Sequence, residues 1–252
     1  MKTSLFAGLV VVLITFQCCK KKETIIDDKP QVKLLTRVVF AIGTNAVFKY
    51  YTYDDKNRLK TVKDGSTTTT YTYNSDELSI IEVINSASGP ISKTEFSYNS
   101  GKITQAVTKE PSRTKVYGYV YVGNDLSEIH VNVSNVVVEK LIYTIVNHNI
   151  TKIVNVTPDG IFTTDYTYGS HKNIFYNSRL SQLIGLEGID RYSLSDLLES
   201  KRTNPDGSFI KEINSYAYDE SGIPVTSSNS VVQSPDKIIF EGKYTYEYEV
   251  GK

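Results

Sequence analysis

Side chains that could carry acid-base or metal chemistry are few in this sequence and scattered along it. Three histidines lie far apart, with no cysteine or carboxylate partner at ligand spacing: His130, His148 and His171. A metal site needs several ligands that converge on one point. We therefore expect surface or loop histidines and predict no metal site.

The acidic run that begins at Asp54 has the composition of a calcium loop but lacks its key positions. An EF-hand loop requires a central glycine and a terminal glutamate, whereas this run is Asp54-Asp55-Lys56-Asn57. Three further aspartates stand directly before glycine, a pair typical of tight turns: Asp64, Asp159 and Asp206. We interpret all of them as turn residues.

Motifs of the common catalytic machineries are missing from the sequence. It contains no Gly-x-Ser-x-Gly, no phosphate loop and no dinucleotide fingerprint. The sequence therefore predicts a protein that is not an enzyme, with no catalytic residues and no cofactor. The alternative is a glycan-directed hydrolase, which would bring two carboxylates about 5 to 10 Å apart at the mouth of a rolled sheet and raise the pKa of one of them.

Tyrosines in a repeated aromatic-x-tyrosine phrase are the remaining candidates for ligand binding. Exposed aromatic rings can stack on sugar rings or on side chains of a protein partner. The residues of this candidate binding face are Tyr51, Tyr53, Tyr71, Tyr73, Tyr119 and Tyr121. The competing interpretation is that the rings form cross-strand pairs that hold a sheet together, and their regular spacing favours it.

The same phrase predicts the architecture, because a repeat specifies how a chain is built. The next aliphatic residue stands five positions after the second aromatic position in most copies, as from Tyr73 to Leu78, and six positions after it from Tyr168 to Ile174. The residues between are turn formers, so each copy is expected to be a hairpin with a four- or five-residue loop. A second set of turns joins the hairpins into an antiparallel meander of about fourteen strands.

Side chains alternate between the two faces of a strand. The aromatic residues of each copy therefore share one face, while intervening residues such as Thr52 and Thr72 share the other. A sheet of this many twisted strands with one apolar face has to roll up, close or be covered. We expect an all-β fold in which the repeated hairpins form a barrel-like or strongly curved sheet.

The repeat is interrupted once, before Ser200. Leucine and isoleucine recur there at intervals of three or four residues, which is a helical period. We predict one or two short helices within residues 178–200, with Ser193 and Ser195 as candidate caps and Asp196 near the positive end of a helix dipole. Their leucine stripe is expected to plug the open end or face of the rolled sheet.

The first residues have the pattern of a targeting signal. An apolar run of twelve residues follows a positive start and is too short to span a membrane. It closes at two cysteines in a way that resembles a bacterial lipoprotein signal, and we expect lipidation at Cys19, with Cys18 as the alternative. Three segments are predicted: a signal peptide (1–19), a flexible tether (20–31) and one β-repeat domain (32–252) with the helical insertion.

Charge is balanced over the chain, with 28 basic and 28 acidic residues. A domain that grips nucleic acid carries a basic surplus, so no nucleic-acid partner is expected. Both cysteines precede the β domain, which is therefore expected to fold without disulfide bonds.

Two families share the motifs of this sequence. The segment Tyr51-Thr52-Tyr53-Asp54, followed by a turn and Leu59, resembles the tyrosine-aspartate repeats of Rhs-type proteins. A lipoprotein signal combined with Tyr-x-Tyr hairpins and an interruption after Lys172 resembles more closely the uncharacterised lipoproteins of Bacteroidota that have a porin-like fold. This likeness spans residues 35–248 and implies an outer-membrane lipoprotein that faces the periplasm or the cell surface, without implying any reaction.

The aspartate of the Rhs-type repeat is present in only part of this chain. It stands at Asp54 and Asp219, and asparagine replaces it at Asn74 and Asn99. The direct comparison with Rhs-type proteins, whose repeats form a large shell, is weakened by this replacement and by the short length of the chain.

A barrel that spans a membrane needs a continuously apolar outer face. Charged residues are scattered through the expected strands instead: Lys60, Lys93, Glu95, Lys115, Glu128 and Lys140. We therefore expect a monomeric domain outside the bilayer, attached to it through a lipid anchor. The resulting hypothesis is a non-enzymatic cell-envelope protein that binds or scaffolds a glycan or an envelope protein.

Overall fold

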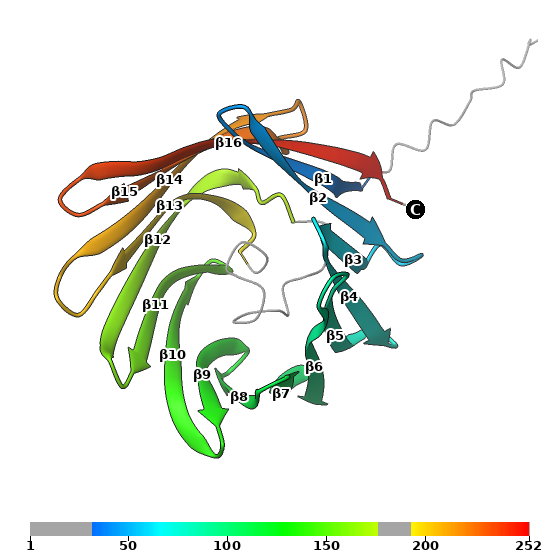
Figure 1. Cartoon of the computed structure of the whole chain (residues 1–252), viewed down its shortest axis with the longest axis vertical. Helices are drawn as coiled ribbons and strands as arrows, with labels where there is room; N and C mark the ends of the chain where they lie inside the picture. The colour runs from blue at the N-terminus through cyan, green and yellow to red at the C-terminus, as the bar shows by residue number, and fades with distance from the viewer. Residues whose placement is uncertain (1–31, 176–192, 252) are drawn as a thin grey trace, which may run out of the picture. The chain divides into compact units, whose positions relative to one another are not determined.

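A computed structural model describes residues 32–175 and 193–251 of the chain. These residues form sixteen antiparallel strands that close into a barrel (Figure 1). Within the same ranges, no helix is long and apolar enough to cross a membrane. The strands are β1 (Lys33–Ile42), β2 (Asn45–Tyr53), β3 (Leu59–Asp64), β4 (Thr67–Asn74), β5 (Glu77–Asn85), β6 (Gly89–Asn99), β7 (Lys102–Glu110), β8 (Arg113–Val122), β9 (Asp125–Val133), β10 (Val136–Val146), β11 (Asn149–Thr157), β12 (Gly160–Lys172), β13 (Ser195–Thr203), β14 (Phe209–Tyr218), β15 (Pro224–Gln233) and β16 (Lys237–Val250).

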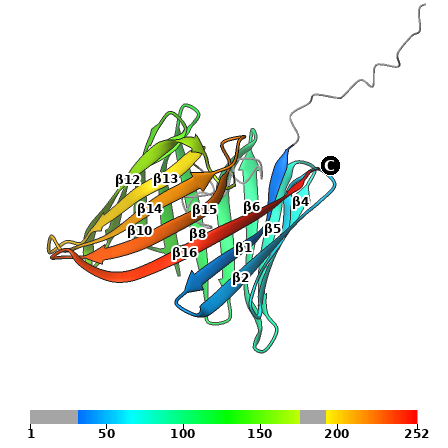
Figure 2. The ribbon, with the colours of Figure 1, turned by 90° about the horizontal axis from the view of Figure 1, so that it is seen from above.

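Every strand pairs with its neighbours in sequence, and the first strand pairs with the last. The β1 to β16 ladder runs from Lys33↔Val250 to Ala41↔Lys243, and β1 pairs with β2 along its other edge. The strands run obliquely around the wall, as Figure 2 shows, and pairing around the whole ring leaves no open sheet edge. The expected antiparallel meander is confirmed, and its closure is a property that the sequence left open.

The wall follows the alternation that the repeat predicts. The aromatic residues Tyr51, Tyr71 and Tyr246 are buried, whereas the intervening Thr52 and Thr72 are exposed. Because successive side chains of a strand point to opposite faces, one face of every hairpin supplies the barrel interior and the other supplies its outer wall.

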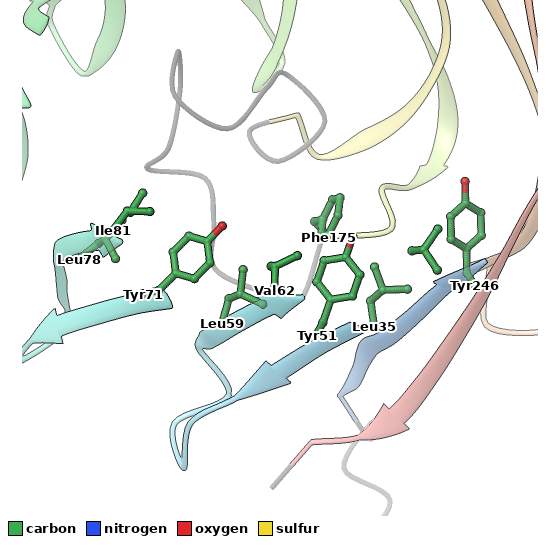
Figure 3. Packing of buried hydrophobic residues seen from close by; sticks show 10 residues of the cluster. Leu35, Tyr51, Leu59, Val62, Tyr71, Leu78, Ile81, Phe175 and Tyr246 are labelled. Atoms are coloured by element: carbon green, nitrogen blue, oxygen red, sulfur yellow. The ribbon is translucent and has the colours of Figure 1, made fainter. Parts of the chain in front are cut away.

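Buried side chains in the interior form two clusters. Core A joins β1 to β5 with β16 (Figure 3) and contains Leu35, Val38, Tyr51, Leu59, Val62, Tyr71, Leu78, Ile81, Phe175 and Tyr246. Core B lies on β7 to β11 and contains Ile103, Ala106, Tyr119, Leu126, Ile129, Val131, Tyr143 and Ile150. Burial of a large apolar side chain stabilises a fold by about 1.5 to 3 kcal/mol, so the repeat places its main stabilising residues at fixed positions.

The five-residue spacing of the repeat is the geometry of a bulged hairpin. Tyr73 pairs with Leu78 and Thr72 pairs with Ile80, so Ser79 is an extra residue in β5. A bulge of this kind bends its strand and increases the local twist, which helps a sheet to curve and close. The same shift recurs in β2/β3, β6/β7, β8/β9, β10/β11, β12/β13 and β14/β15.

Most turns within the repeat are shorter than predicted. Asn74 pairs directly with Glu77, which leaves a two-residue turn of Ser75 and Asp76, and Ser75 has a positive φ of 53°. Asn74 and Glu77, which flank the turn, belong to the β4/β5 ladder. The expectation of a four-residue loop was therefore wrong at this turn. Short turns of this type match the right-handed twist of a hairpin.

Aspartate is retained where the loop has five residues. Asp54 Oδ1 accepts hydrogen bonds of 2.9 Å from the main-chain N–H groups of Lys56 and Arg58. Asp219 Oδ1 accepts equivalent bonds of 2.9 and 3.0 Å from Ser221 and Ile223. The replacement of aspartate by asparagine in other copies therefore accompanies a change from a five-residue loop to a two-residue turn.

The helical prediction for residues 178–200 is wrong. Ser195–Thr203 form β13, and the described residues contain no helix; the part of the predicted helical segment up to residue 192 lies outside them. Tyr168 pairs with Leu197 and Thr167 with Glu199, so Leu197, rather than Ile174, takes the aliphatic place in this copy of the repeat. Ladder bonds to both β12 and β14 outweigh the local spacing of the leucines, which short apolar segments leave ambiguous.

Candidate functional site

A cavity of about 600 Å³ lies inside the barrel, between the wall formed by β1 to β3 and the wall formed by β13 to β16. Its lining combines aromatic rings with amides and charged groups. Small-molecule sites are concave, largely preformed and lined by apolar side chains with a few placed polar groups. This cavity is therefore the candidate site.

Stacked aromatic rings form one wall of the cavity. The rings of Phe40 and Tyr244 have centroids 4.5 Å apart and lie at 23°, and those of Tyr244 and Tyr246 lie 6.4 Å apart at 1°. Phe40 and Tyr244 are register partners in β1 and β16. Gly242 makes room for this arrangement, because a Cβ atom there would lie 2.5 Å from the Phe40 ring. The result is a continuous aromatic strip.

Amide groups stand on the neighbouring strands. The Asn229 Nδ2 atom donates a hydrogen bond of 2.9 Å to Asn214 Oδ1, so β14 and β15 present an oriented pair of amides to the cavity. An amide that has used one donor and one acceptor still has another donor and further acceptor capacity. This wall can therefore bind hydroxyl groups.

Charged residues line the same cavity. The Lys49 Nζ atom on β2 lies 3.0 Å from Asp64 Oδ2 at the end of β3, and Glu212 on β14 also contributes to the lining. Asp64 was interpreted from the sequence as a turn residue alone. It does precede a turn at Gly65, but the alternation of β3 also directs it inward.

The segment after β12 brings residues into the barrel. The main-chain N–H of Phe175 donates a hydrogen bond of 2.7 Å to Asn173 Oδ1, and the N–H of Asn173 donates one of 3.0 Å to the Leu194 carbonyl oxygen. The Phe175 ring joins core A, 5.8 Å from the Tyr51 ring (Figure 3). Residues 173–175 therefore connect the β12 wall to the opposite one and line part of the cavity.

Asp196 is a buried carboxylate that sequence reasoning placed in a helix. It accepts hydrogen bonds from the main-chain N–H of His171, at 3.0 Å, and from the Tyr218 hydroxyl. Burial and the hydrogen bond to Asp196 raise the pKa of Tyr218, and the Tyr218 ring stacks on His171 with centroids 3.8 Å apart. The sequence signals the position of Asp196 only through an acidic residue that stands between Leu194 and Leu197. A buried strand rarely contains an acidic residue.

Asp196 fills an irregularity in the β12 to β13 ladder. Residues 169–171 bulge opposite it, and a Cβ atom on Gly169 would lie 2.4 Å from Asp196 Oδ2. A glycine is therefore needed for the backbone to approach the carboxylate. We assign Asp196 a structural role in this bulge, in addition to its place in the cavity lining.

The candidate tyrosines divide between the two interior clusters. Tyr51 and Tyr71 are buried in core A and Tyr119 in core B. Tyr53 and Tyr73 are half-buried and donate hydrogen bonds of 2.8 Å to the carbonyl oxygens of other strands. Tyr51 also lines the cavity.

Tyr121, the sixth candidate, packs against core B. The Lys102 Nζ atom lies 5.3 Å from the centroid of the Tyr121 ring, which is a cation–π distance. Tyr121 therefore belongs to a different part of the interior from Tyr51, and the structure does not bring all six rings together.

Burial controls the ionisation of the interior tyrosines. Burial, with a smaller contribution from the charge of Asp54, raises the pKa of Tyr73 to about 12. Burial is also the largest cause of the raised pKa values of Tyr119 and Tyr143. These phenols stay protonated at neutral pH, and that of Tyr73 donates a hydrogen bond to the Leu59 carbonyl oxygen.

The histidines lie in three separate places. His130 Nε2 lies 2.7 Å from Glu128 Oε2 on β9, and Lys140 Nζ on β10 lies 2.9 Å from the same oxygen. His130 therefore has a carboxylate neighbour within hydrogen-bonding distance, because residues two apart share a strand face. His148 occupies a turn with a positive φ of 62°, and His171 stacks on a tyrosine as described above. Among the described residues, no group of three or more histidine, cysteine, aspartate or glutamate side chains could hold a metal ion.

Among the described residues, every carboxylate with a clearly shifted pKa has a lowered one. Hydrogen bonds from His130 and Lys140 lower the pKa of Glu128. The other lowered carboxyl groups are Asp54, Glu95, Glu110, Asp206 and Asp219. A general acid for glycoside hydrolysis requires the opposite shift, so these six groups are not suited to that role.

Two solved structures with this fold are porin-like proteins from Bacteroides. The protein from Bacteroides uniformis aligns with a TM-score of 0.60 over 87% of this chain and 99% of its own, at 12% identity. The protein from Bacteroides vulgatus aligns with a TM-score of 0.54 over 86% of this chain and 99% of its own, at 16% identity. No protein-family model matches the chain, and no curated protein matches it. The likeness establishes a porin-like fold, which confirms that part of the expected resemblance.

Proposed function

We propose that this chain is a non-enzymatic binding module of the cell envelope that retains a glycan in the cavity of its barrel. The observation that carries the proposal is the lining, in which the aromatic strip of Phe40, Tyr244 and Tyr246 stands beside the amides of Asn214 and Asn229. A sugar ring has apolar C–H faces and polar hydroxyl edges. Tyrosine and phenylalanine rings match the faces, and amides match the edges.

Charged side chains on the outer wall of the barrel favour a domain that stands outside the bilayer. On β6, Glu95 lies 3.1 Å from Lys93 and 3.4 Å from Lys109 of β7, and Lys93 also reaches Glu82 of β5 at 4.0 Å. Charges in the middle of an outward face are costly in contact with lipid. A second outward group consists of Glu128, His130 and Lys140.

Membrane attachment is assigned to the N-terminal cysteines, with Cys19 as the lipidated residue and Cys18 as the alternative. Two acyl chains hold a protein stably at a membrane, whereas one does so only marginally. In cells, Cys19→Ser should move the protein from the membrane fraction to the soluble fraction and remove palmitate labelling, while Cys18→Ser should not. The reverse result would assign the anchor to Cys18, and labelling that survives both substitutions would contradict the anchor.

Glycan binding is tested by blocking the cavity from within. Asn229→Trp adds a large ring to the cavity lining, and Ser228→Trp adds the same ring to the outer face of the same strand, where Ser228 is exposed. The purified protein is titrated with a panel of bacterial envelope oligosaccharides by calorimetry, and each bound glycan is recovered and analysed by mass spectrometry.

We expect retention of at least one glycan, its loss in Asn229→Trp, its persistence in Ser228→Trp and recovery of the glycan unchanged. Equal effects of the two tryptophans would contradict a binding site in the cavity. Cleavage of the glycan would favour the hydrolase instead. An absence of binding across the panel would overturn the proposed function.

A further inference from the structure

We propose that the ligand of the cavity is a glycolipid, whose sugar lies against the polar lining and whose aliphatic chain lies along an apolar mouth of the barrel. This inference rests on the proposed function and adds the chemical class of the ligand. Its basis is the order in which polar and apolar side chains follow one another along the inward faces of the strands that line the cavity.

The cavity opens toward the end of the barrel at which β1 turns into β2 and β13 turns into β14. Neighbouring strands are antiparallel, so the turns that follow the odd-numbered strands all lie at this end. The exposed fraction of the inward side chains rises along β1 from 7% at Val38 to 44% at Ile42. Along β2 it rises from 6% at Tyr51 to 47% at Val47. The cavity therefore has a buried floor near Val38 and Tyr51 and a mouth at Ile42 and Val47.

Apolar side chains line this mouth on five successive strands of the ring. Ile42 shares the inward face of β1 with Phe40 of the cavity lining, because the β1/β2 ladder is unbroken between them. Ile210 shares the inward face of β14 with Asn214 for the same reason. The mouth collar consists of Ile210 of β14, Val231 of β15, Phe240 of β16, Ile42 of β1 and Val47 of β2.

Polar side chains lie deeper than the collar on both walls of the cavity. On β2, Lys49 is the next inward residue after Val47, and its Nζ atom lies 3.0 Å from Asp64 Oδ2. On β15, Asn229 is the next inward residue after Val231 and donates its hydrogen bond to Asn214 of β14. A ligand whose hydroxyl groups reach these polar side chains therefore has its outer part at the collar.

The exposed apolar surface of the collar favours a hydrocarbon chain as that outer part. A free oligosaccharide would occupy the polar lining and leave Ile42, Val47 and Ile210 in contact with water. Transfer of apolar surface out of water is favourable, and each buried methylene group gains about fourfold in affinity. Because the collar and the polar lining are carried by the same strands, one glycolipid molecule can cover both.

A matched control lies on the outer face of β14. Ile213 is 38% exposed, against 39% for Ile210, and adjoins an outer groove together with Ser215 and Glu241. Ile210→Ser and Ile213→Ser therefore make the same chemical change in the same strand and at the same degree of exposure. A difference in binding between the two variants reports the position of the isoleucine, at the mouth or outside the barrel.

The experiment titrates the purified protein by calorimetry with three probes, each below its micelle-forming concentration. Methyl β-glucoside and octyl β-glucoside share a sugar and differ in their chain, whereas tetraethylene glycol monooctyl ether carries the octyl chain without a sugar. Octyl β-glucoside should bind at least about tenfold more tightly than methyl β-glucoside, the gain from about two buried methylene groups, and more tightly than the ether.

The variants test whether the collar causes this preference for the octyl chain. Ile210→Ser removes an aliphatic contact and should reduce the ratio of the two glucoside affinities at least about threefold. Ile213→Ser should leave the ratio unchanged. Equal ratios in the two variants would overturn the assignment of the chain to the mouth collar.

The remaining outcomes separate this inference from the function on which it rests. If the two glucosides bind equally, or if neither binds while an oligosaccharide of the envelope panel does, the glycolipid is wrong and the glycan site stands. If the ether binds as tightly as octyl β-glucoside, the sugar contributes nothing and the glycolipid is again wrong. If neither glucoside and no oligosaccharide binds, both proposals fail together.

Discussion

The hydroxyl of Tyr73 donates a hydrogen bond of 2.8 Å to the main-chain carbonyl oxygen of Leu59. Pairing between β3 and β4 ends at Thr61↔Thr70, so Leu59 has no main-chain partner in β4. A buried carbonyl without a hydrogen bond would be costly. The tyrosine hydroxyl therefore closes the gap between two hairpins where their ladder has ended.

The same relationship recurs around the barrel, with hydrogen-bond lengths of 2.7 to 3.1 Å. In each case the acceptor lies beyond the end of the ladder between successive hairpins. The further pairs are Tyr53 with Leu35, Tyr98 with Leu78, Tyr168 with Ile150, Tyr216 with Leu197 and Tyr248 with Pro224. The conserved position of tyrosine within this chain's own repeats thus has a structural cause.

Removal of one such hydroxyl should destabilise the barrel. Tyr73→Phe leaves the Leu59 carbonyl without its donor and should lower the free energy of unfolding by about 1 to 2 kcal/mol, measured by urea denaturation. Tyr119→Phe is the control, because the buried Tyr119 hydroxyl has no hydrogen-bond partner in the described part of the chain. That control should be neutral or stabilising, and equal losses in the two variants would contradict the role of the Tyr73 hydrogen bond.

The approach of Gly169 to Asp196 predicts a strong effect of one methyl group. Gly169→Ala would place Cβ 2.4 Å from Asp196 Oδ2, and relief of that overlap should cost about 2 to 3 kcal/mol or more, measured by thermal and urea unfolding. Gly118→Ala on β8 is the control, because a Cβ there meets nothing within 4 Å. It should change stability by less than about 0.5 kcal/mol.

A double variant tests whether contact with Asp196 causes the loss of stability expected for Gly169→Ala. Asp196→Ala removes the carboxylate that the new methyl group would meet, although it also removes the acceptor for His171 and Tyr218. The Gly169→Ala/Asp196→Ala protein should therefore be more stable than the sum of the two single effects predicts. Strictly additive losses would show that the methyl group acts elsewhere.

The Lys33–Asp219 pair predicts a pH dependence. Burial opposes ionisation of Asp219, but hydrogen bonds from Lys33 and Ser221 outweigh it and hold the carboxyl pKa well below its ordinary value of 3.8. Because the folded pKa is the lower one, the ionised group stabilises the fold above pH 3.8, and this contribution disappears as pH falls through the folded pKa.

Asp219→Asn should therefore reduce stability at pH 7, by on the order of 1 kcal/mol for a partly exposed pair, and by progressively less in acid. Urea midpoints of wild type and variant between pH 7 and pH 2 would measure the difference. Lys33→Gln should remove part of the same contribution. A difference that stays constant from pH 7 to pH 2 would refute this account.

Substitution by alanine should cost different amounts of stability in the five-residue loop that begins at Asp54 and at the two-residue turn after Asn74. Asp54→Ala removes the acceptor for the N–H groups of Lys56 and Arg58 and should destabilise the protein by about 1 to 2 kcal/mol. Asn74→Ala alters a two-residue turn whose geometry is set by main-chain pairing with Glu77 and should cost less than about 0.5 kcal/mol. Equal costs in chemical denaturation would contradict the role assigned to the aspartate.

The sequence predicted those parts of the fold in which side-chain character repeats over a few residues. Alternation around Tyr51 and Tyr71 was sufficient to identify the strands, their inner face and the meander. It failed around Leu197 and Leu198, because leucines three or four apart suit a helix as well as a bulged strand. It also assigned Asp196 to a helix start, since the bulge that buries this carboxylate forms only when β12 and β13 pair.

The candidate site was less predictable than the fold. The alternation places Asn214 and Tyr216 on one face of β14, but the sequence does not indicate that this face meets Lys49 and Asp64 across a cavity. That meeting depends on ring closure and on the stagger of the strands. The one candidate tyrosine that lines the cavity, Tyr51, could not be distinguished from its copies elsewhere in the repeat.

The sequence by itself determined an all-β meander with the tyrosines of the repeat, such as Tyr51, inside and the intervening threonines, such as Thr52, outside, because side-chain alternation and turn chemistry act over a few residues. Only the tertiary structure decided that Lys33 pairs with Val250, that the ring closes, and that polar groups from distant strands share one cavity. These features bring together residues that are far apart in the sequence, in the case of Lys33 and Val250 by almost the full length of the β domain. No local period encodes such contacts, which arise when bulge-induced curvature brings the first strand to the last.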